Sequence, residues 1–197
     1  MKDWLQKLSQ GLGVVGALAI AFPILFKIHE GETIFNPLSY FMWSSLSVLA
    51  AVVLYRAGEG GWQLLAAYWA SDFSIASYAY FKARKLEFGW FEGFVIGLVA
   101  VCTIIWLRCE TKRRYSGQTD YRPSVIANAT ALMLAGVPQV WDAWKKPNEV
   151  SMFIAWSYIG ISVASFFGES KFNGRLVPGV SIVYWIVIIV PVLYLRT

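Results

Sequence analysis

The sequence predicts an all-α polytopic membrane protein, with seven transmembrane helices arranged as two parallel three-helix repeats that are joined by a linker helix. Three observations lead to this fold class: the composition, the number of long apolar segments, and a set of features that recurs along the chain. Of the 197 residues, 57% are hydrophobic and only 15% are charged, whereas soluble domains have about 25% charged residues. The chain therefore has too few charges to cover a soluble surface, and a bilayer is the better solvent.

A spanning helix needs about 20 consecutive, mostly apolar residues. Seven segments have this character: 9–27, 37–56, 61–81, 91–108, 123–141, 150–168 and 176–195. The third is the least apolar, and the first is short. The charged, Gly-containing stretch 109-CETKRRYSGQTDYR-122 is predicted to be a loop. The fourth segment thus stands alone between two groups of three.

The two groups of three share landmarks in the same order. Pro23 and Pro138 end apolar runs, Trp43 and Trp156 each precede a serine, and a Tyr-Trp pair occurs at 68–69 and at 184–185; the offsets are 113 to 116 residues. Three helices per repeat plus one extra helix give two units of the same orientation. The predicted domains are a first bundle at 1–86, a linker helix with a charged loop at 87–122, and a second bundle at 123–197.

The stretch 136-GVPQVWDAWKKPNEVSMFIAW-156 is a polar elbow between two apolar runs. Proline lacks an N–H and clashes with the preceding turn, so Pro23 and Pro138 are predicted to bend their helices at matched places. A backbone carbonyl freed by the bend needs a new partner inside a membrane. Gly136 allows close approach of a neighbouring helix. The alternative is that both prolines serve packing alone.

The Pro138-Gln139 pair, the basic turn after it and the aromatic-rich helix that follows resemble the PQ-loop transporters. That group includes the SWEET sugar transporters, their bacterial half-sized relatives and cystinosin-like amino-acid exporters. The first repeat departs from the pattern, because 23-PI-24 replaces Pro-Gln. Vitamin transporters of the nicotinamide-riboside type are similar in layout. The resemblance implies alternating access, with Pro23, Pro138 and Gln139 as gating or hinge residues and a central cavity lined by both halves. It also makes Asp142 a candidate proton-coupling residue, although Asp142 can equally be a solvated charge.

Asp72 is the sharpest candidate for a site, because it lies in the middle of the third apolar segment. An ionisable residue there costs at least about 2.5 kcal/mol on insertion scales and usually has a function. It can take a proton, bind a cationic group or accept hydroxyl donors, and the alternative is a structural hydrogen bond to a Ser or Tyr. Asn128 is a second polar group in a span, and it can bind a ligand or tie helices together.

The recurring tryptophans Trp43, Trp69, Trp156 and Trp185 complete the predicted substrate site. Their rings can stack on a sugar or another flat solute, or they can lie at the bilayer interface or in the core. His29 is the only histidine and lies beside Glu30 and Glu32. Spacing alone is weak support for a metal site, so a solvated loop is the preferred interpretation.

These features predict a carrier, either a facilitator or a proton-coupled transporter, for a small polar solute such as a sugar. An amino-acid or vitamin carrier of the same layout and a sorting or peptide receptor are alternatives. No catalytic motif or cofactor motif is found, so neither an enzyme nor a cofactor is expected. The net charge of +5 is read as a topology signal rather than as nucleic-acid binding. The expected location is the plasma (cell inner) membrane, as a multi-pass protein in the lipid bilayer, and self-association into a homo-oligomer is left open.

Two observations bear on which side of the membrane the N-terminus lies, and they oppose each other. In the predicted topology, ten of the 17 Lys and Arg residues fall on the side of the N-terminus and seven on the other side. The positive-inside rule then places the N-terminus in the cytoplasm. The PQ-loop resemblance implies the reverse.

Overall fold

The computed structural model describes residues 2–31, 37–56, 61–83, 89–117, 122–169 and 172–195. These residues form nine α-helices and one short 3-10 helix, with no β-strand among them. The helices are α1 (Lys2–Ala19), α2 (Ala21–Glu30), α3 (Pro37–Arg56), α4 (Trp62–Ala83), α5 (Trp90–Ser116), α6 (Arg122–Ala135), α7 (Val137–Lys145), η1 (Pro147–Glu149), α8 (Met152–Gly168) and α9 (Phe172–Leu195). The predicted all-α class is confirmed.

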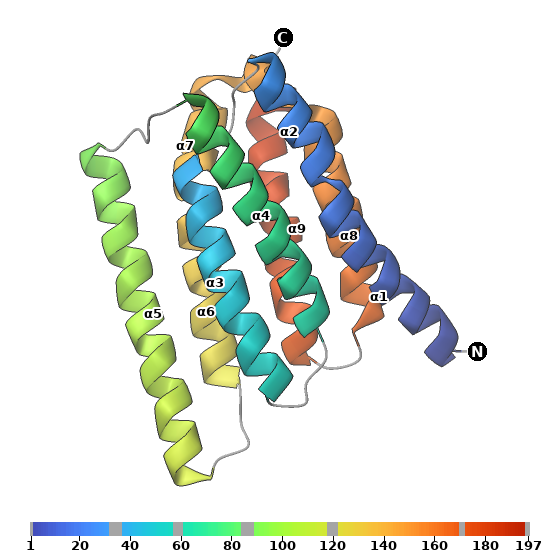
Figure 1. Cartoon of the computed structure of the whole chain (residues 1–197), viewed down its shortest axis with the longest axis vertical. Coiled ribbons are helices and arrows are strands. Elements are labelled where there is room, and N and C mark those ends of the chain that lie inside the picture. Colours follow the sequence, from blue (N-terminus) through green and yellow to red (C-terminus); the bar gives the residue numbers. More distant parts are fainter. Residues whose placement is uncertain are drawn as a thin grey trace.

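Two pairs of helices run on from one another, so that the nine α-helices form seven rods (Figure 1). A single residue separates α1 from α2, and Gly136 alone separates α6 from α7. Pro23 and Pro138 each lie in the first turn of the second helix of their pair. Proline is tolerated there because the first-turn N–H groups have no partner within the helix. Each predicted bending point therefore coincides with a break in a rod.

Four stretches are long and apolar enough to cross a membrane, which identifies the chain as a membrane protein. They are Trp4–Glu30, Pro37–Tyr55, Trp90–Ser116 and Gly174–Tyr194. The apolar helix α8 is shorter than these, at 17 residues. The polar α4 and the broken α6–α7 rod are not among the four.

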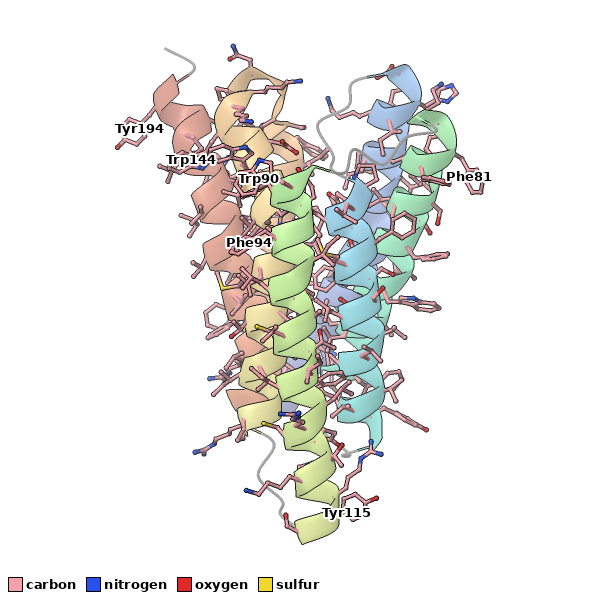
Figure 2. All side chains as sticks on the ribbon, turned by 90° about the vertical axis from the view of Figure 1, so that its left-hand side faces the viewer. Phe81, Trp90, Phe94, Tyr115, Trp144 and Tyr194 are labelled. Atoms are coloured by element: carbon pink, nitrogen blue, oxygen red, sulfur yellow. The ribbon has the colours of Figure 1, made fainter. Side chains whose placement is uncertain are left out.

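The outer surface carries large exposed aromatic side chains near both ends of the rods. Figure 2 shows Phe81, Trp90, Trp144 and Tyr194 close to one end and Tyr115 at the other, and all five are more than half exposed. Tyrosine and tryptophan gather at membrane–water interfaces because one part of the ring is apolar and another is polar. This distribution agrees with a protein that lies in a bilayer.

The helices form one bundle with α5 at an edge (Figure 1), and we refer to α1 to α4 as the first group and to α6 to α9 as the second group. In the first group α4 packs against α1, α2 and α3, and in the second α9 packs against α6, α7 and α8. The groups meet where α1 packs on α8 and where α3 packs on α6, and α5 packs on α6 and α7. The α1–α8 contact is close, since a Cβ added at Gly16 would lie 2.7 Å from Ile161 Cγ1 and Ser9 Oγ donates to the Ala164 carbonyl over 2.6 Å.

The charged stretch 109–122 differs from its prediction, because α5 continues through it as far as Ser116. The Glu110 carboxylate accepts hydrogen bonds from Arg113, at 2.6 Å from Nη2, and from Arg114, at 3.1 Å from Nε. Ion pairs three and four residues apart stabilise a helix. The high charge of this stretch suggested a loop, but the three- and four-residue spacing of its opposite charges favours a helix.

Candidate functional site

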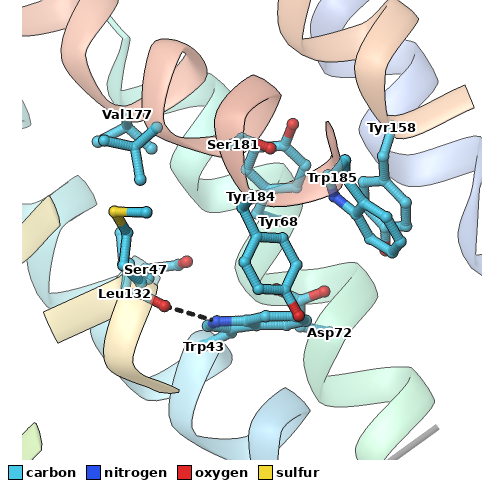
Figure 3. Close-up of a pocket in the computed structure, with 12 residues that line it drawn as sticks. Trp43, Ser47, Tyr68, Asp72, Leu132, Tyr158, Val177, Ser181, Tyr184 and Trp185 are labelled. Atoms are coloured by element: carbon cyan, nitrogen blue, oxygen red, sulfur yellow. Dashed lines mark hydrogen bonds between the residues drawn. The ribbon is translucent and has the colours of Figure 1, made fainter. Parts of the chain in front are cut away.

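A cavity of about 80 Å³ lies in the middle of the bundle, between the two groups of helices. Residues of α3, α4, α6, α8 and α9 enclose it (Figure 3). The lining residues are Trp43, Ser47, Tyr68, Asp72, Leu132, Met133, Tyr158, Val177, Val180, Ser181, Tyr184 and Trp185. Apolar and aromatic side chains predominate, which is typical of a small-molecule site.

Asp72 is the acidic residue of this cavity and lies halfway along α4. It is only 5% exposed. Within the described part of the chain, its carboxylate makes no hydrogen bond and no ion pair, and no Lys, Arg or His lines the cavity. Leaving a buried charge unpaired is costly. The structural alternative, a hydrogen bond from Asp72 to a neighbouring Ser or Tyr, is therefore not realised.

Four buried tyrosines surround the Asp72 carboxyl group closely enough to interact with it electrostatically. They come from three other helices as well as from α4, and they are Tyr40, Tyr68, Tyr158 and Tyr184. A phenol hydroxyl can donate to a carboxylate or accept from its protonated form. Among the described residues, the surroundings of Asp72 thus contain hydroxyl groups and aromatic rings, and no basic side chain lines the cavity.

The aromatic rings form a continuous wall along one side of the cavity (Figure 3). Trp185 stacks on Tyr158 with ring centroids 4.4 Å apart and an interplanar angle of 11°. Tyr184 meets Trp185 edge to face at 5.5 Å and meets Trp43 in the same way at 5.2 Å. Such pairs add roughly 0.5–1.5 kcal/mol each beyond the area they bury, so the wall is a well-fixed surface.

The same wall supports the break between α6 and α7. The Gly136 N–H donates to the Met133 carbonyl over 3.1 Å, three residues back, instead of to Leu132. The Leu132 carbonyl is left without its helical donor and accepts the Trp43 indole N–H over 2.8 Å (Figure 3). The Gly136 carbonyl accepts the Tyr184 hydroxyl over 3.2 Å. At this break the Leu132 carbonyl, freed by the turn at Gly136 and not by Pro138, has its partner on a neighbouring helix.

Hydroxyl groups link the two groups of helices at another part of the cavity wall. Ser162 Oγ donates to Ser181 Oγ over 2.8 Å, and the Tyr68 hydroxyl lies 3.5 Å from Ser162 Oγ. This chain connects α4 with α8 and α9. Two of its three members line the cavity, so polar ligand groups have hydroxyl partners there.

A second, smaller cavity of about 20 Å³ lies on the elbow side of Trp185. Trp185 borders both cavities, so its ring separates them. Gln139 lines the smaller cavity, and its Oε1 is buried without a hydrogen bond to any described residue. The elbow glutamine therefore faces a space next to the aromatic wall rather than the central cavity itself.

Three of the predicted substrate-binding residues line the central cavity, namely Trp43, Asp72 and Trp185. The structure does not bring the other three to it. Trp69 and Trp156 are 42% and 55% exposed on the outer surface. Asn128 is buried in α6, where its Oδ1 has no hydrogen bond among the described residues, but it is not part of the cavity lining.

The remaining candidates lie near the elbow end. Pro138 is fully buried, Pro23 is half-buried, and Asp142 is half-buried in α7 outside both cavities. His29 lies in the last turn of α2, with Nδ1 2.8 Å from the Tyr78 hydroxyl on α4. Glu32 lies outside the described residues. No group of three His, Cys, Asp or Glu side chains suited to a metal occurs in the described ranges.

The tyrosines of the cavity were not predicted, although one signal was present. Tyr68 and Asp72 are four residues apart in α4, and residues four apart share a face of a helix. In α9, Tyr184 likewise lies four residues after Val180, which also lines the cavity. Searching for aromatic residues on the face that carries Asp72 would have added Tyr68 to Trp69, since residues three and four apart share a helix face.

No family model, curated protein sequence or solved structure matches this chain. The site consists of a cavity between helices with the buried carboxyl group of Asp72, an aromatic wall, and a helix break attached to that wall.

Proposed function

We propose that the protein is an alternating-access carrier for a small polar solute, with the 3+1+3 layout of the PQ-loop and SWEET-like transporters. One observation carries the proposal. The buried carboxylate of Asp72, which has no partner among the described residues, faces a partly open, largely aromatic cavity where the two groups of helices meet. In a membrane protein such a group marks a substrate or ion pathway far more often than a packing site.

The packing of the helices supports the repeat layout. The rods α1–α2, α3 and α4 correspond in order to α6–α7, α8 and α9, and the first rod of each group is broken just before its proline. The third rod of each group packs against the other two. The contacts between the groups, α1 with α8 and α6 with α3, exchange when the groups are exchanged. A parallel repeat related by a two-fold axis has this property.

The contacts of the aromatic wall supply a link from solute to movement. Trp43 and Tyr184 line the cavity and also bind the Leu132 and Gly136 carbonyls at the α6–α7 break. A solute that shifts either ring changes the support of the break. A ligand can bias two conformations only through contacts that differ between them, and on this proposal these two hydrogen bonds are the contacts that change.

The identity of the solute depends on what lines the cavity. A sugar was favoured by several tryptophans and an amide, but Trp69, Trp156 and Asn128 lie outside the cavity whereas Asp72 lies inside it. A volume of about 80 Å³ is also small beside the ~300–1,000 Å³ of typical ligand pockets. The cavity must widen for a sugar, and its single charge favours a solute that interacts with a carboxylate.

The test is uptake into proteoliposomes of a panel of sugars, amino acids, vitamins and small amines, with and without a pH gradient. We expect uptake of one chemical class, and Asp72→Asn is expected to reduce it at least about tenfold, because the charge that Asp72 contributes to the cavity is lost. Glu30→Gln, an exposed carboxylate at the end of α2, serves as the matched control. If no solute enters while a peptide binds tightly, the protein is a receptor and the carrier proposal is wrong.

A further inference from the structure

The residues that line the central cavity favour a positively charged ligand. Its lining contains one carboxylate, the aromatic rings of two tryptophans and three tyrosines, and two serine hydroxyls. Aromatic ring faces and a carboxylate both attract a cation. An anion would meet Asp72 without any Lys, Arg or His among the described lining residues to offset the repulsion.

A neutral solute fits the cavity less well than a cation does. Asp72 is 5% exposed and has no hydrogen-bond or ion-pair partner among the described residues. A neutral polyol would supply hydroxyl donors but would not balance the charge of an ionised Asp72. A monocation would cancel that charge, and the pair would lie beside the aromatic rings of the lining, in a site of low polarity, where cation–π attraction is strongest.

Size narrows the class further. About 80 Å³ is space for roughly five water molecules, if each needs ~15 Å³ of this kind of volume. A quaternary ammonium or protonated amine head group is of this size. A bare metal ion fits the cavity less well, because it needs several oxygen ligands and the described lining offers a single carboxylate.

We propose that the cavity binds an organic monocation, with Asp72 as its counter-ion and the rings of Trp43, Trp185 and Tyr184 as its cage. Ser47 and Ser181 provide hydroxyl groups for a polar tail such as an alcohol. This inference rests on the proposed function only in taking the cavity to be the solute site. Binding itself does not require that the bound solute be transported.

The experiment is equilibrium binding by titration calorimetry to the purified protein in detergent. The probes are choline and its uncharged carbon analogue, in which a tert-butyl group replaces the trimethylammonium group. The two have the same shape and differ in charge. We expect choline to bind at least about tenfold more tightly than the analogue, since a desolvated cation–π contact with a carboxylate depends on the charge.

Two variants locate the site. Asp72→Asn is expected to weaken choline binding at least about tenfold without improving binding of the analogue. Glu30→Gln, which removes an exposed carboxylate, is expected to leave choline binding unchanged. Size-exclusion chromatography checks that each variant is folded and monodisperse. If Asp72→Asn does not fold, the comparison of the two probes on the unmodified protein still decides the question.

Equal binding of choline and its analogue would overturn the proposal, because the cavity would then recognise shape and not charge. Undiminished choline binding by a folded Asp72→Asn variant would overturn it too. No choline binding at all would have the same consequence, while uptake of another solute into proteoliposomes would still stand for the carrier. Choline binding without any transport would uphold the site and contradict the carrier, so the two failures are distinguishable.

Discussion

Gly136 is the residue at which the cavity and the helix break meet. Its backbone angles, φ −84° and ψ −12°, are available to any residue. Glycine is needed here for space, because a Cβ would press against the Tyr184 ring and would lie 2.7 Å from Trp43 Cζ2. The two rings can bind the carbonyls of the break only because no side chain stands between them.

Replacing Gly136 by alanine is therefore expected to destabilise the protein by about 1–3 kcal/mol, as overpacking does in a well-packed core. Thermal unfolding of the purified protein measures the effect. The matched control is Gly160→Ala in α8, where a Cβ meets no atom within 4 Å. The control is expected to stay within about 0.5 kcal/mol, and equal effects of the two substitutions would contradict the account of Gly136.

At the scale of the helices, the α6–α7 rod is bent, yet the Leu132 carbonyl at the bend keeps a hydrogen bond. The break shifts one N–H from Leu132 to Met133, and the Trp43 indole takes the vacant place at Leu132. Trp43 belongs to α3, which packs against α6, so the bend is supported by a helix of the other group. The helix break and the aromatic wall thus form one hydrogen-bonded unit.

The substitution Trp43→Phe tests this unit, since it keeps an aromatic ring but removes the indole N–H. The Leu132 carbonyl would then lack its donor, which costs about 1–3 kcal/mol for a buried group. We expect a lower unfolding temperature and faster backbone hydrogen exchange near residues 132–140. Trp90→Phe is the control, because Trp90 is 84% exposed. A Trp43→Phe variant that behaves like the control would show that the bond does not support the break.

At the scale of the whole molecule, Asp72 can serve two ions in turn. The Asp72 carboxylate holds either a proton or a monocation. If the carrier returns without solute while Asp72 is protonated, each cycle exchanges one proton for one monocation and moves no net charge. The titratable groups around Asp72 are Tyr40 on α3, Tyr68 on α4, Tyr158 on α8 and Tyr184 on α9. Among the described residues, no second carboxylate lines the cavity to take over the proton.

Choline uptake into proteoliposomes is accordingly expected to be driven by an acidic interior, because protons leave through the carrier as choline enters. Asp72→Asn should abolish this coupling. Trp185→Leu should reduce uptake at least about tenfold by removing part of the cation cage, while Trp69→Leu should not, since Trp69 lies outside the cavity. Uptake that follows the membrane potential and ignores the pH gradient would rule out exchange.

Much of the fold was predictable from the chain alone. The segment 37–56 and the helix α3 coincide, and the prolines Pro23 and Pro138 marked both breaks in the rods. Asp72 stood out because a carboxylate inside an apolar segment has a high cost whatever the fold. The end of α5 was not predicted, since the charges at 109–116 resemble a loop until their helical spacing is considered.

The sequence by itself determined most of the helices, the places where two of the rods break, and a charged group inside an apolar segment, Asp72. Only the tertiary structure decided which aromatic residues accompany that group. Trp69 and Trp185 occupy the same place in two Tyr-Trp pairs, yet one is 42% exposed and the other 4%. Lipid is as apolar as a protein core, so neither hydrophobicity nor periodicity tells which face of a membrane helix points inward. The rotation of each helix is set by its neighbours, and here the packing of α9 on α7 and α8 turns Trp185 toward Asp72 and Tyr158.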